Sequence, residues 1–190
     1  MSQQDPLKLS AMPTPNPNTV KFNVNREFFE RGSVNFTTPE DAQSNPLAKA
    51  LFDVDGLVGV MIGKDFVSIS KHPDVGWEKV IEPASDTIER IATDINEVVT
   101  PALLEALTSA SAQDSEDVQK IKHILDEEIR PAIAMDGGDC EFHSYENGIL
   151  TLNLQGACSS CPSATMTLKM GIENRLKEEI PDLKEVVQIL

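Results

Sequence analysis

The chain alternates strictly between apolar and polar positions at residues 20–25, where VKFNVN places valine or phenylalanine at every second position. This period of two predicts a strand with one buried face. The residues TPNPN, which begin at Thr14, precede the strand and predict a turn, because proline and asparagine favour turn conformations. The stretch SVNF at 33–36 predicts a second, shorter strand.

A short helix, a hairpin and a long helix are predicted next. Asn45 suits the N-cap of a helix that begins at Pro46 and ends near Gly56, because its side chain can accept from free helical amides. The runs LVGVMIG and FVSISK flank residues 63–65 and predict a hairpin. Apolar residues at spacings of three and four from 80 to 98 predict a long helix with a proline in its first turns.

A second set of elements follows SASAQDS at 109–115, which contains no large apolar residue and predicts a flexible linker. Ser115 or Asp114 can cap a helix whose apolar face extends to Ile129 and which ends near Arg130-Pro131. The glycines of the following MDGGD predict a turn, because paired glycines supply the positive φ that other residues resist.

A hairpin, a helix and a strand complete the chain. CEFHSY and ILTLNL flank residues 146–148, ENG, and the alternating leucines of the second run predict an antiparallel hairpin with one buried face. Apolar residues from Met166 to Ile180 predict a helix between Pro162 and Pro181. The last residues, LKEVVQIL, predict a strand.

These patterns predict an α+β protein with two small α+β domains joined by a flexible linker, the C-terminal one in the order helix, strand, strand, helix, strand. We expect a disordered N-terminus over residues 1–13 and a first domain over 14–100. A linker over 101–114 and a second domain over 115–190 follow.

Composition narrows the classes of function. The 190 residues are 40% hydrophobic and 25% charged, and no run of eighteen apolar residues predicts a membrane span. Sixteen basic and 31 acidic side chains give a formal charge of -15, which disfavours nucleic acid and anionic membranes as partners. The start MSQQDPLKLS lacks the pattern of a secretory signal and the arginines of an organellar transit peptide, so we expect a cytoplasmic protein in a bacterial cytosol.

The chemistry of the chain centres on Cys158 and Cys161, a C-x-x-C pair directly before Pro162 and a predicted helix. A helix N-terminus favours thiolate, which suits a dithiol oxidoreductase of thioredoxin type. That class, however, places its motif after a strand of a βαβ unit, and this motif follows an antiparallel hairpin.

Metal binding is the second interpretation of the pair. A zinc or iron-sulfur centre needs four ligands, and the chain offers no second pair of cysteines at chelating spacing. A two-fold dimer would bring two such loops together and supply four sulfur ligands from identical surfaces. The residues alone leave open whether such a dimer would hold zinc or an iron-sulfur cluster.

Other candidate groups carry weaker signals. Cys140 fits a buried strand side chain better than a third ligand, because free cysteine is among the most buried residue types. Asp136 and Asp139 are too few for a calcium loop and fit a turn in which they bond nearby amides. The three histidines are scattered along the chain, at positions His72, His123 and His143, and do not predict a metal site. Neither a phosphate-binding loop nor an activated nucleophile is recognisable in the sequence.

The residues RPAIAMDGGDCEFHSYENGILTLNLQGACSSCPSATMTLKMGIENRLKEEIPDL resemble the C-terminal domain of NifU and of the Nfu iron-sulfur carriers. Its hallmarks are a DGGD turn, a hairpin, G-A/S-C-x-x-C-P-S and a T-L-K-x-G-I helix. The first part of the chain resembles the N-terminal domain of two-domain Nfu proteins from bacteria and mitochondria. This resemblance rests on TPNPNTVKF, NPLAKALFDVDGLVGVMIGKDFVSISK and Trp77. Cys140 departs from the aliphatic residue that the family carries after its DGGD turn.

The resemblance implies a carrier, not an enzyme. It implies that Cys158 and Cys161 bind a [4Fe-4S] cluster that bridges two chains of a homodimer. The carrier would receive the cluster from an upstream assembly scaffold and transfer it to apo iron-sulfur proteins, with the N-terminal domain as a docking module. A dithiol oxidoreductase and a zinc-bridged dimer are the alternatives.

Overall fold

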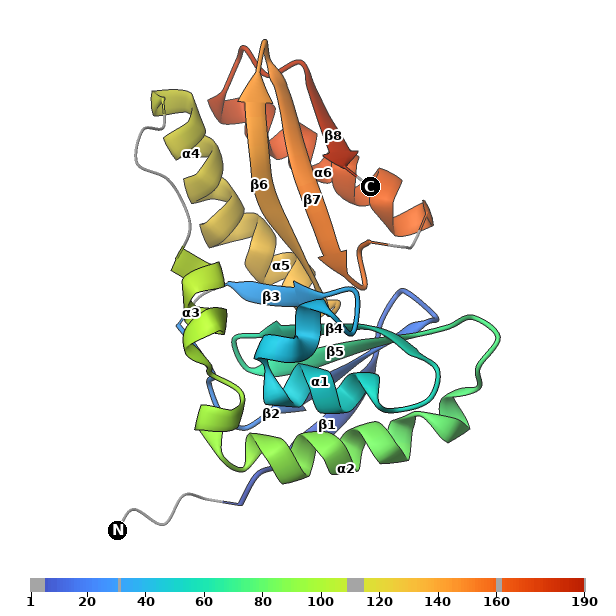
Figure 1. Cartoon of the computed structure of the whole chain (residues 1–190). Coiled ribbons are helices and arrows are strands. Elements are labelled where there is room, and N and C mark those ends of the chain that lie inside the picture. The colour runs from blue at the N-terminus through green and yellow to red at the C-terminus, as the bar shows by residue number, and fades with distance from the viewer. Residues whose placement is uncertain (1–5, 31, 109–114, 160–161, 190) are drawn as a thin grey trace. The chain divides into compact units, whose positions relative to one another are not determined.

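The computed structural model of the chain describes residues 6–30, 32–108, 115–159 and 162–189. Side chains are described for the same residues except 105–108 and 162–165. The chain divides into two compact units, residues 1–109 and 110–190, whose elements are labelled in Figure 1. Each unit combines helices with a sheet, which confirms the predicted α+β class.

The first unit contains an antiparallel five-stranded sheet in the order β1-β2-β5-β4-β3. The predicted strands and hairpin of this region are confirmed. The strands are β1 (Leu9–Pro13), β2 (Thr19–Val24), β3 (Ser33–Phe36), β4 (Leu57–Gly63) and β5 (Phe66–Lys71).

The helices of the first unit cover the apolar face of this sheet (Figure 1). Asn45 caps the first helix as predicted: its side-chain oxygen accepts from the Ala48 amide at 3.0 Å, and its amide nitrogen donates to the Val98 carbonyl at 2.7 Å. The helices are α1 (Pro46–Phe52), α2 (Ile81–Ala92) and α3 (Pro101–Thr108), with 3₁₀ turns η1 (Asp41–Ser44), η2 (Trp77–Lys79) and η3 (Ile95–Glu97). The helix predicted from 80 to 98 is thus interrupted after Ala92, and Asp94 caps the separate turn η3.

Two segments of the first unit differ from the sequence-based prediction. Residues 9–13, expected to be disordered, form β1 because they pair with β2 from Leu9 opposite Val24 to Pro13 opposite Val20. Residues 101–108, expected to be linker, form α3, and Leu103 is buried in the core of the unit. The rest of the expected linker, 109–114, lies outside the described residues.

The second unit has the predicted order of helix, strand, strand, helix and strand. Its sheet runs in the order β6-β7-β8, with β7 antiparallel to β6 and parallel to β8. The elements are α4 (Glu116–Ile124), the π-helical turn η4 (Leu125–Ile129), α5 (Arg130–Met135), β6 (Gly138–Glu146), β7 (Ile149–Gly156), α6 (Pro162–Glu179) and β8 (Glu185–Ile189). Ser115 caps α4 through its hydroxyl, which accepts from the Val118 amide at 3.4 Å.

The first helical segment of this unit continues beyond its predicted end at Arg130-Pro131. It extends to Met135 because the wider turn η4 precedes Pro131 and ends at Ile129, two residues before it. A proline inside a helix lacks an amide and crowds the carbonyl four residues earlier, and a π-type turn relieves this conflict. Local sequence rules that end a helix before proline therefore failed here.

The hairpin of β6 and β7 turns at Asn147 and Gly148, both with positive φ, as a two-residue connection requires. Its apolar face packs against α4, α5 and α6 (Figure 1). The alternating leucines predicted to face the core are all buried, at positions Leu150, Leu152 and Leu154. Among the described residues, no helix is both long and apolar enough to span a membrane.

Candidate functional site

Cys158 lies in a tight turn directly after β7. The turn begins at Gly156, whose positive φ of 61° suits a residue without a side chain. The Cys158 amide donates to the Gln155 carbonyl at 3.3 Å, and the Ser159 amide and hydroxyl donate to the Gly156 carbonyl at 3.2 and 2.9 Å. Backbone bonds therefore fix the place of this cysteine.

The thiol turn is joined to the DGGD turn, which precedes β6. Gly138 pairs with Gly156 at the end of the β6–β7 ladder. One residue further, the Ala157 amide donates to the Gly137 carbonyl at 3.1 Å. Two segments that are about twenty residues apart in the sequence therefore form one small region of backbone.

The two glycines of the DGGD turn have different physical roles. Gly137 has a positive φ of 74°, as predicted for this turn, but Gly138 does not lie in the left-handed region. A Cβ atom at Gly138 would overlap the Sγ atom of Cys158 and lie 3.1 Å from its Cβ. The prediction that both glycines supply positive φ is wrong for Gly138, whose missing side chain leaves room for the sulfur.

Cys158 is a buried residue, with 5% of its surface exposed, and it belongs to the apolar core of the second unit. The other half of the predicted pair, Cys161, lies outside the described residues. The proposed ligand pair therefore rests on the sequence, and the structure supplies the surroundings of Cys158 alone.

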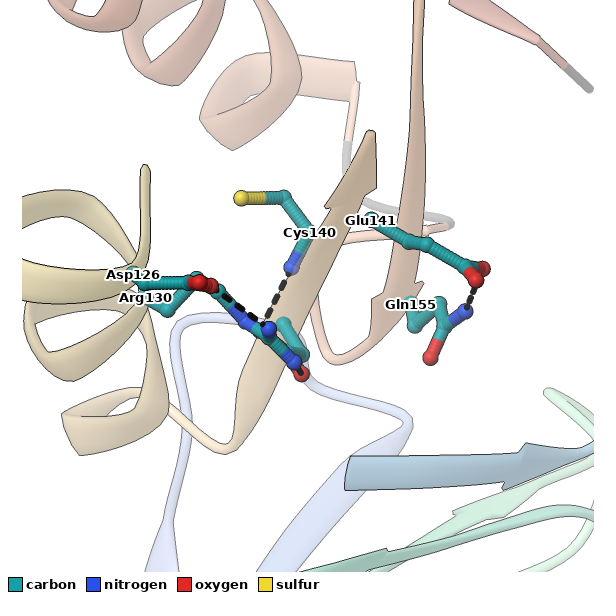
Figure 2. A network of polar contacts seen from close by, with 6 residues as sticks. Asp126, Arg130, Cys140, Glu141 and Gln155 are labelled. Atoms are coloured by element: carbon teal, nitrogen blue, oxygen red, sulfur yellow. Dashed lines mark hydrogen bonds and ion pairs between the residues drawn. The ribbon is translucent and has the colours of Figure 1, made fainter. Parts of the chain in front are cut away.

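Cys140 is the third residue of β6 and is 1% exposed. In Figure 2 its side chain and that of Glu141 leave the strand on opposite sides. Burial raises the pKa of the Cys140 thiol well above its ordinary value, and the negative charge of Asp139 raises it further. Cys140 thus lies in the core of the second unit, which confirms the prediction of a buried strand side chain.

A charged network that sequence reasoning missed holds the DGGD turn (Figure 2). Arg130 donates to both oxygens of the buried Asp139, at 2.8 and 2.7 Å, and to Asp126 at 2.9 Å. Burial opposes the charge of Arg130, but these carboxylates outweigh it and raise its pKa. Asp139 also accepts from the Cys140 amide at 2.8 Å, as predicted for an aspartate of a turn.

Only part of this network could be seen in the sequence. Asp126 and Arg130 are four residues apart on one helical segment, a spacing that brings side chains together. The approach of Asp139 depends on how α5 and β6 pack. Among the described residues, no three His, Cys, Asp or Glu side chains are grouped so that they could hold a metal ion.

Comparisons with known proteins identify the family. A family model described as "NifU-like domain" matches residues 121–187, and one described as "Scaffold protein Nfu/NifU N terminal" matches residues 9–94. "NifU-like protein 5, mitochondrial" of Arabidopsis thaliana is 38% identical over 196 residues, which cover 99% of this chain and 70% of that protein. The chain belongs to the NifU-like (Nfu) family. The resemblance noted in the sequence is confirmed.

Other relatives extend the comparison. "NFU1 iron-sulfur cluster scaffold homolog, mitochondrial" of Drosophila persimilis is 40% identical to this NifU-like chain, which spans 63% of that protein's length. These relatives are named as mitochondrial proteins, so the prediction of a cytoplasmic location is contradicted. A solution structure titled "NifU-like protein from Saccharomyces cerevisiae" is 23% identical, covers 49% of this chain and 84% of its own, and has a TM-score of 0.41.

One helix of this NifU-like chain carries apolar side chains in solvent. Met166 and Met170 on α6 are 69% and 60% exposed, whereas Ile172 and Leu176 of the same helix are buried in the core. The helix was predicted correctly, and Met166, the first residue of its apolar pattern, lies outside the core. A Cβ atom at Gly171, next to Met170, would have no neighbour within 4 Å. We call Met166, Met170 and Gly171 the methionine face.

Proposed function

We propose that this chain is an iron-sulfur cluster scaffold and carrier that binds a [4Fe-4S] cluster between two copies of itself through Cys158 and Cys161. The observation that carries the proposal is the C-x-x-C pair directly before α6 in a chain of the NifU-like family. A relative named as an iron-sulfur cluster scaffold matches 93% of the chain, which supports the same role. The cluster is the cargo of this protein and not a permanent part of it.

Counting ligands leads to a dimer. A four-iron cluster takes four thiolates, and one chain offers two at chelating spacing. A two-fold axis beside the loop doubles the pair, so each chain contributes Cys158 and Cys161. Cys140 is not counted as a further ligand, because it lies at 1% exposure within β6 and outside the C-x-x-C pair.

The local backbone favours thiolate at this place. Pro162 is the first residue of α6, where its missing amide costs nothing. Free amides in the first turn of a helix stabilise negative charge on a group that precedes it, which favours thiolate at Cys158 and Cys161. Deprotonated sulfur is the form that binds iron.

Transfer is an exchange of ligands. Each bond between iron and a carrier sulfur breaks as an acceptor thiolate forms a bond to the same iron, and the released carrier thiolate takes up a proton. No electron moves and no bond to carbon changes, so the carrier is not an enzyme. An upstream assembly scaffold supplies the cluster, apo iron-sulfur proteins receive it, and the first unit serves as a docking module.

The methionine face supports self-association beside the thiol loop. It lies on the first three turns of α6, and the next outward position, Asn174, is polar. Methionine side chains adapt to more than one partner surface, and a glycine lets a second helix approach closely. Such a surface suits a carrier that contacts a second copy when loaded and an acceptor during transfer.

Ligand substitution tests the proposal. Cys158→Ala and Cys161→Ala should each abolish cluster binding after anaerobic reconstitution while the circular dichroism spectrum of the fold is retained. Cys140→Val is the matched control and should retain the cluster, because Cys140 lies in the apolar core and is not one of the proposed ligands. A Cys158→Ala variant that still holds a full cluster would refute the ligand assignment.

The same reconstitution separates the alternatives. A dithiol oxidoreductase would retain no metal and would form a reversible disulfide within one chain. A zinc-bridged dimer would retain zinc without sulfide and would not release it to an acceptor.

A further inference from the structure

We infer that the chain without a cluster stores the Cys158 thiol in a space left by Gly138, and that the thiol turn must open to present this sulfur to iron. Gly138 is then a positioning residue for Cys158. The role of iron in this inference rests on the proposed function. The stored state of the thiol does not rest on the proposed function, and it can be tested on the chain without iron.

The first argument is the fit between the two residues. The space that a side chain at Gly138 would fill is occupied by the Cys158 sulfur, and a Cβ atom there would also lie 3.2 Å from the Cys158 amide nitrogen. Atoms this close cannot coexist, so the Cys158 side chain must leave this position or one segment must move. Because Gly138 does not have a positive φ, the turn itself does not require glycine here.

The second argument is the conflict between burial and ligation. Cys158 is 5% exposed and packs in the same apolar cluster as Leu154 and Ile172. A sulfur that bridges to a cluster shared with a second chain must reach the surface. The buried position therefore represents a closed state, in which the thiol is shielded from oxidants and alkylating agents.

The third argument is that opening can remain local. The bonds of the turn that carries Cys158 include those from the amides of Ala157, Cys158 and Ser159 and from the Ser159 hydroxyl. These bonds lie beyond the last pair of the β6–β7 ladder, Gly138 with Gly156. Lifting the turn breaks the bond from Ala157 to Gly137 but leaves the ladder in place, so the opening can remain local.

Alkylation by iodoacetamide under reducing, metal-free conditions measures the stored state. Digestion after glutamate separates Cys140 from Cys158, and tandem mass spectrometry reports the modification of each. In the native chain we expect Cys158 to react at least about tenfold more slowly than in urea-unfolded chain, and Cys140 to be protected as well. Cys158 reacting at the unfolded rate in the native chain would overturn the inference.

Gly138→Ala should speed alkylation of Cys158 by roughly tenfold while Cys140 remains protected. Cys140 thus reports whether the core as a whole has loosened. Gly59→Ala in β4 is the control, because its new Cβ would meet no atom closer than 3.5 Å, and it should leave both rates unchanged. Unchanged reactivity of Cys158 in a folded Gly138→Ala variant would contradict the positioning role.

A double-mutant cycle covers the case in which Gly138→Ala unfolds the unit. The loss of thermal stability caused by Gly138→Ala should shrink by about half or more in a Cys158→Ala background, because the overlapping sulfur is gone. Equal losses in both backgrounds would overturn the inference. If the alkylation and coupling results hold but no cluster binds, the storage of the thiol stands and the proposed function fails.

Discussion

At the scale of single residues, two buried cysteines have different surroundings. Cys140 sits within β6 beside the charge of Asp139, whereas Cys158 sits in a turn that precedes a helix. Burial and the negative charge of Asp139 raise the pKa of the Cys140 thiol. Its place in the core makes it a structural residue whose ionisation opposes folding.

Alkaline pH tests this reading of Cys140. Because its pKa is raised by folding, the stability it contributes is fully present below the ordinary thiol pKa of about 8.5. As pH rises above that value, only the unfolded chain ionises Cys140, so the free energy of unfolding falls by up to about 1.4 kcal/mol per pH unit. Urea unfolding of the cluster-free chain between pH 7 and pH 10 should show this loss, and Cys140→Val should lose less over the same range.

Removing Arg130 tests the network around the DGGD turn. Arg130→Met would leave the carboxylate of Asp139, whose side chain is 7% exposed, without its bidentate partner. We expect a loss of about 3 kcal/mol of stability in the second unit, measured by urea unfolding. Arg175→Met is the control, because Arg175 pairs with the exposed Glu128, and it should cost about 1 kcal/mol or less. Equal losses for both variants would contradict the assigned role of Arg130.

At the scale of elements, local signals in the sequence predicted local structure. Three such signals act within a few residues, and all three were predicted correctly. They are the helix start at Asn45 and Pro46, the hairpin turn at Asn147 and Gly148, and the cap of α4 at Ser115. Edge strand β1 depends on its pairing with β2, and helix α3 depends on packing in the core of the first unit, so no local pattern predicted them. The space beside Gly138 and the Arg130–Asp139 pair likewise require segments that only folding brings together.

Helix α6 shows why the face of a helix is harder to predict than the helix itself. Its apolar residues lie on both the buried and the exposed side, so periodicity alone could not assign Met166. The core side is defined by contact with the sheet of the second unit. The outward apolar residues are then left for a partner, which is why we connect them with self-association.

Charge on the methionine face should block assembly without harming the fold. Met166→Glu combined with Met170→Glu places two carboxylates where the second copy is proposed to pack. We expect the reconstituted chain to lose most of its dimer, by roughly tenfold or more in dimer affinity, while the thermal midpoint of the cluster-free chain stays the same. Asn174→Glu, one turn further along α6, is the control and should have little effect. A fully dimeric, cluster-loaded double variant would exclude the methionine face from the interface.

At the scale of the whole molecule, two units each have their own apolar core. The family, the two-part α+β class and the C-terminal element order were all within reach of the sequence, because the motif residues occur at fixed spacings. The cellular location was not predicted correctly. The cytoplasmic location inferred from the first residues is contradicted by relatives that are named as mitochondrial. The thiol pair belongs to the second unit. The formal charge of the whole chain is -15, which disfavours nucleic acid as cargo.

The most direct test of the central claim is a combined measurement of metal, sulfide and mass. The chain is reconstituted anaerobically with iron, sulfide and zinc all available, and the dimer fraction is analysed by native mass spectrometry. The account predicts about two irons and two acid-labile sulfides per chain, which correspond to one four-iron cluster shared by two chains. A dimer with about half a zinc per chain and no sulfide would contradict it. So would a single chain that holds a complete four-iron cluster.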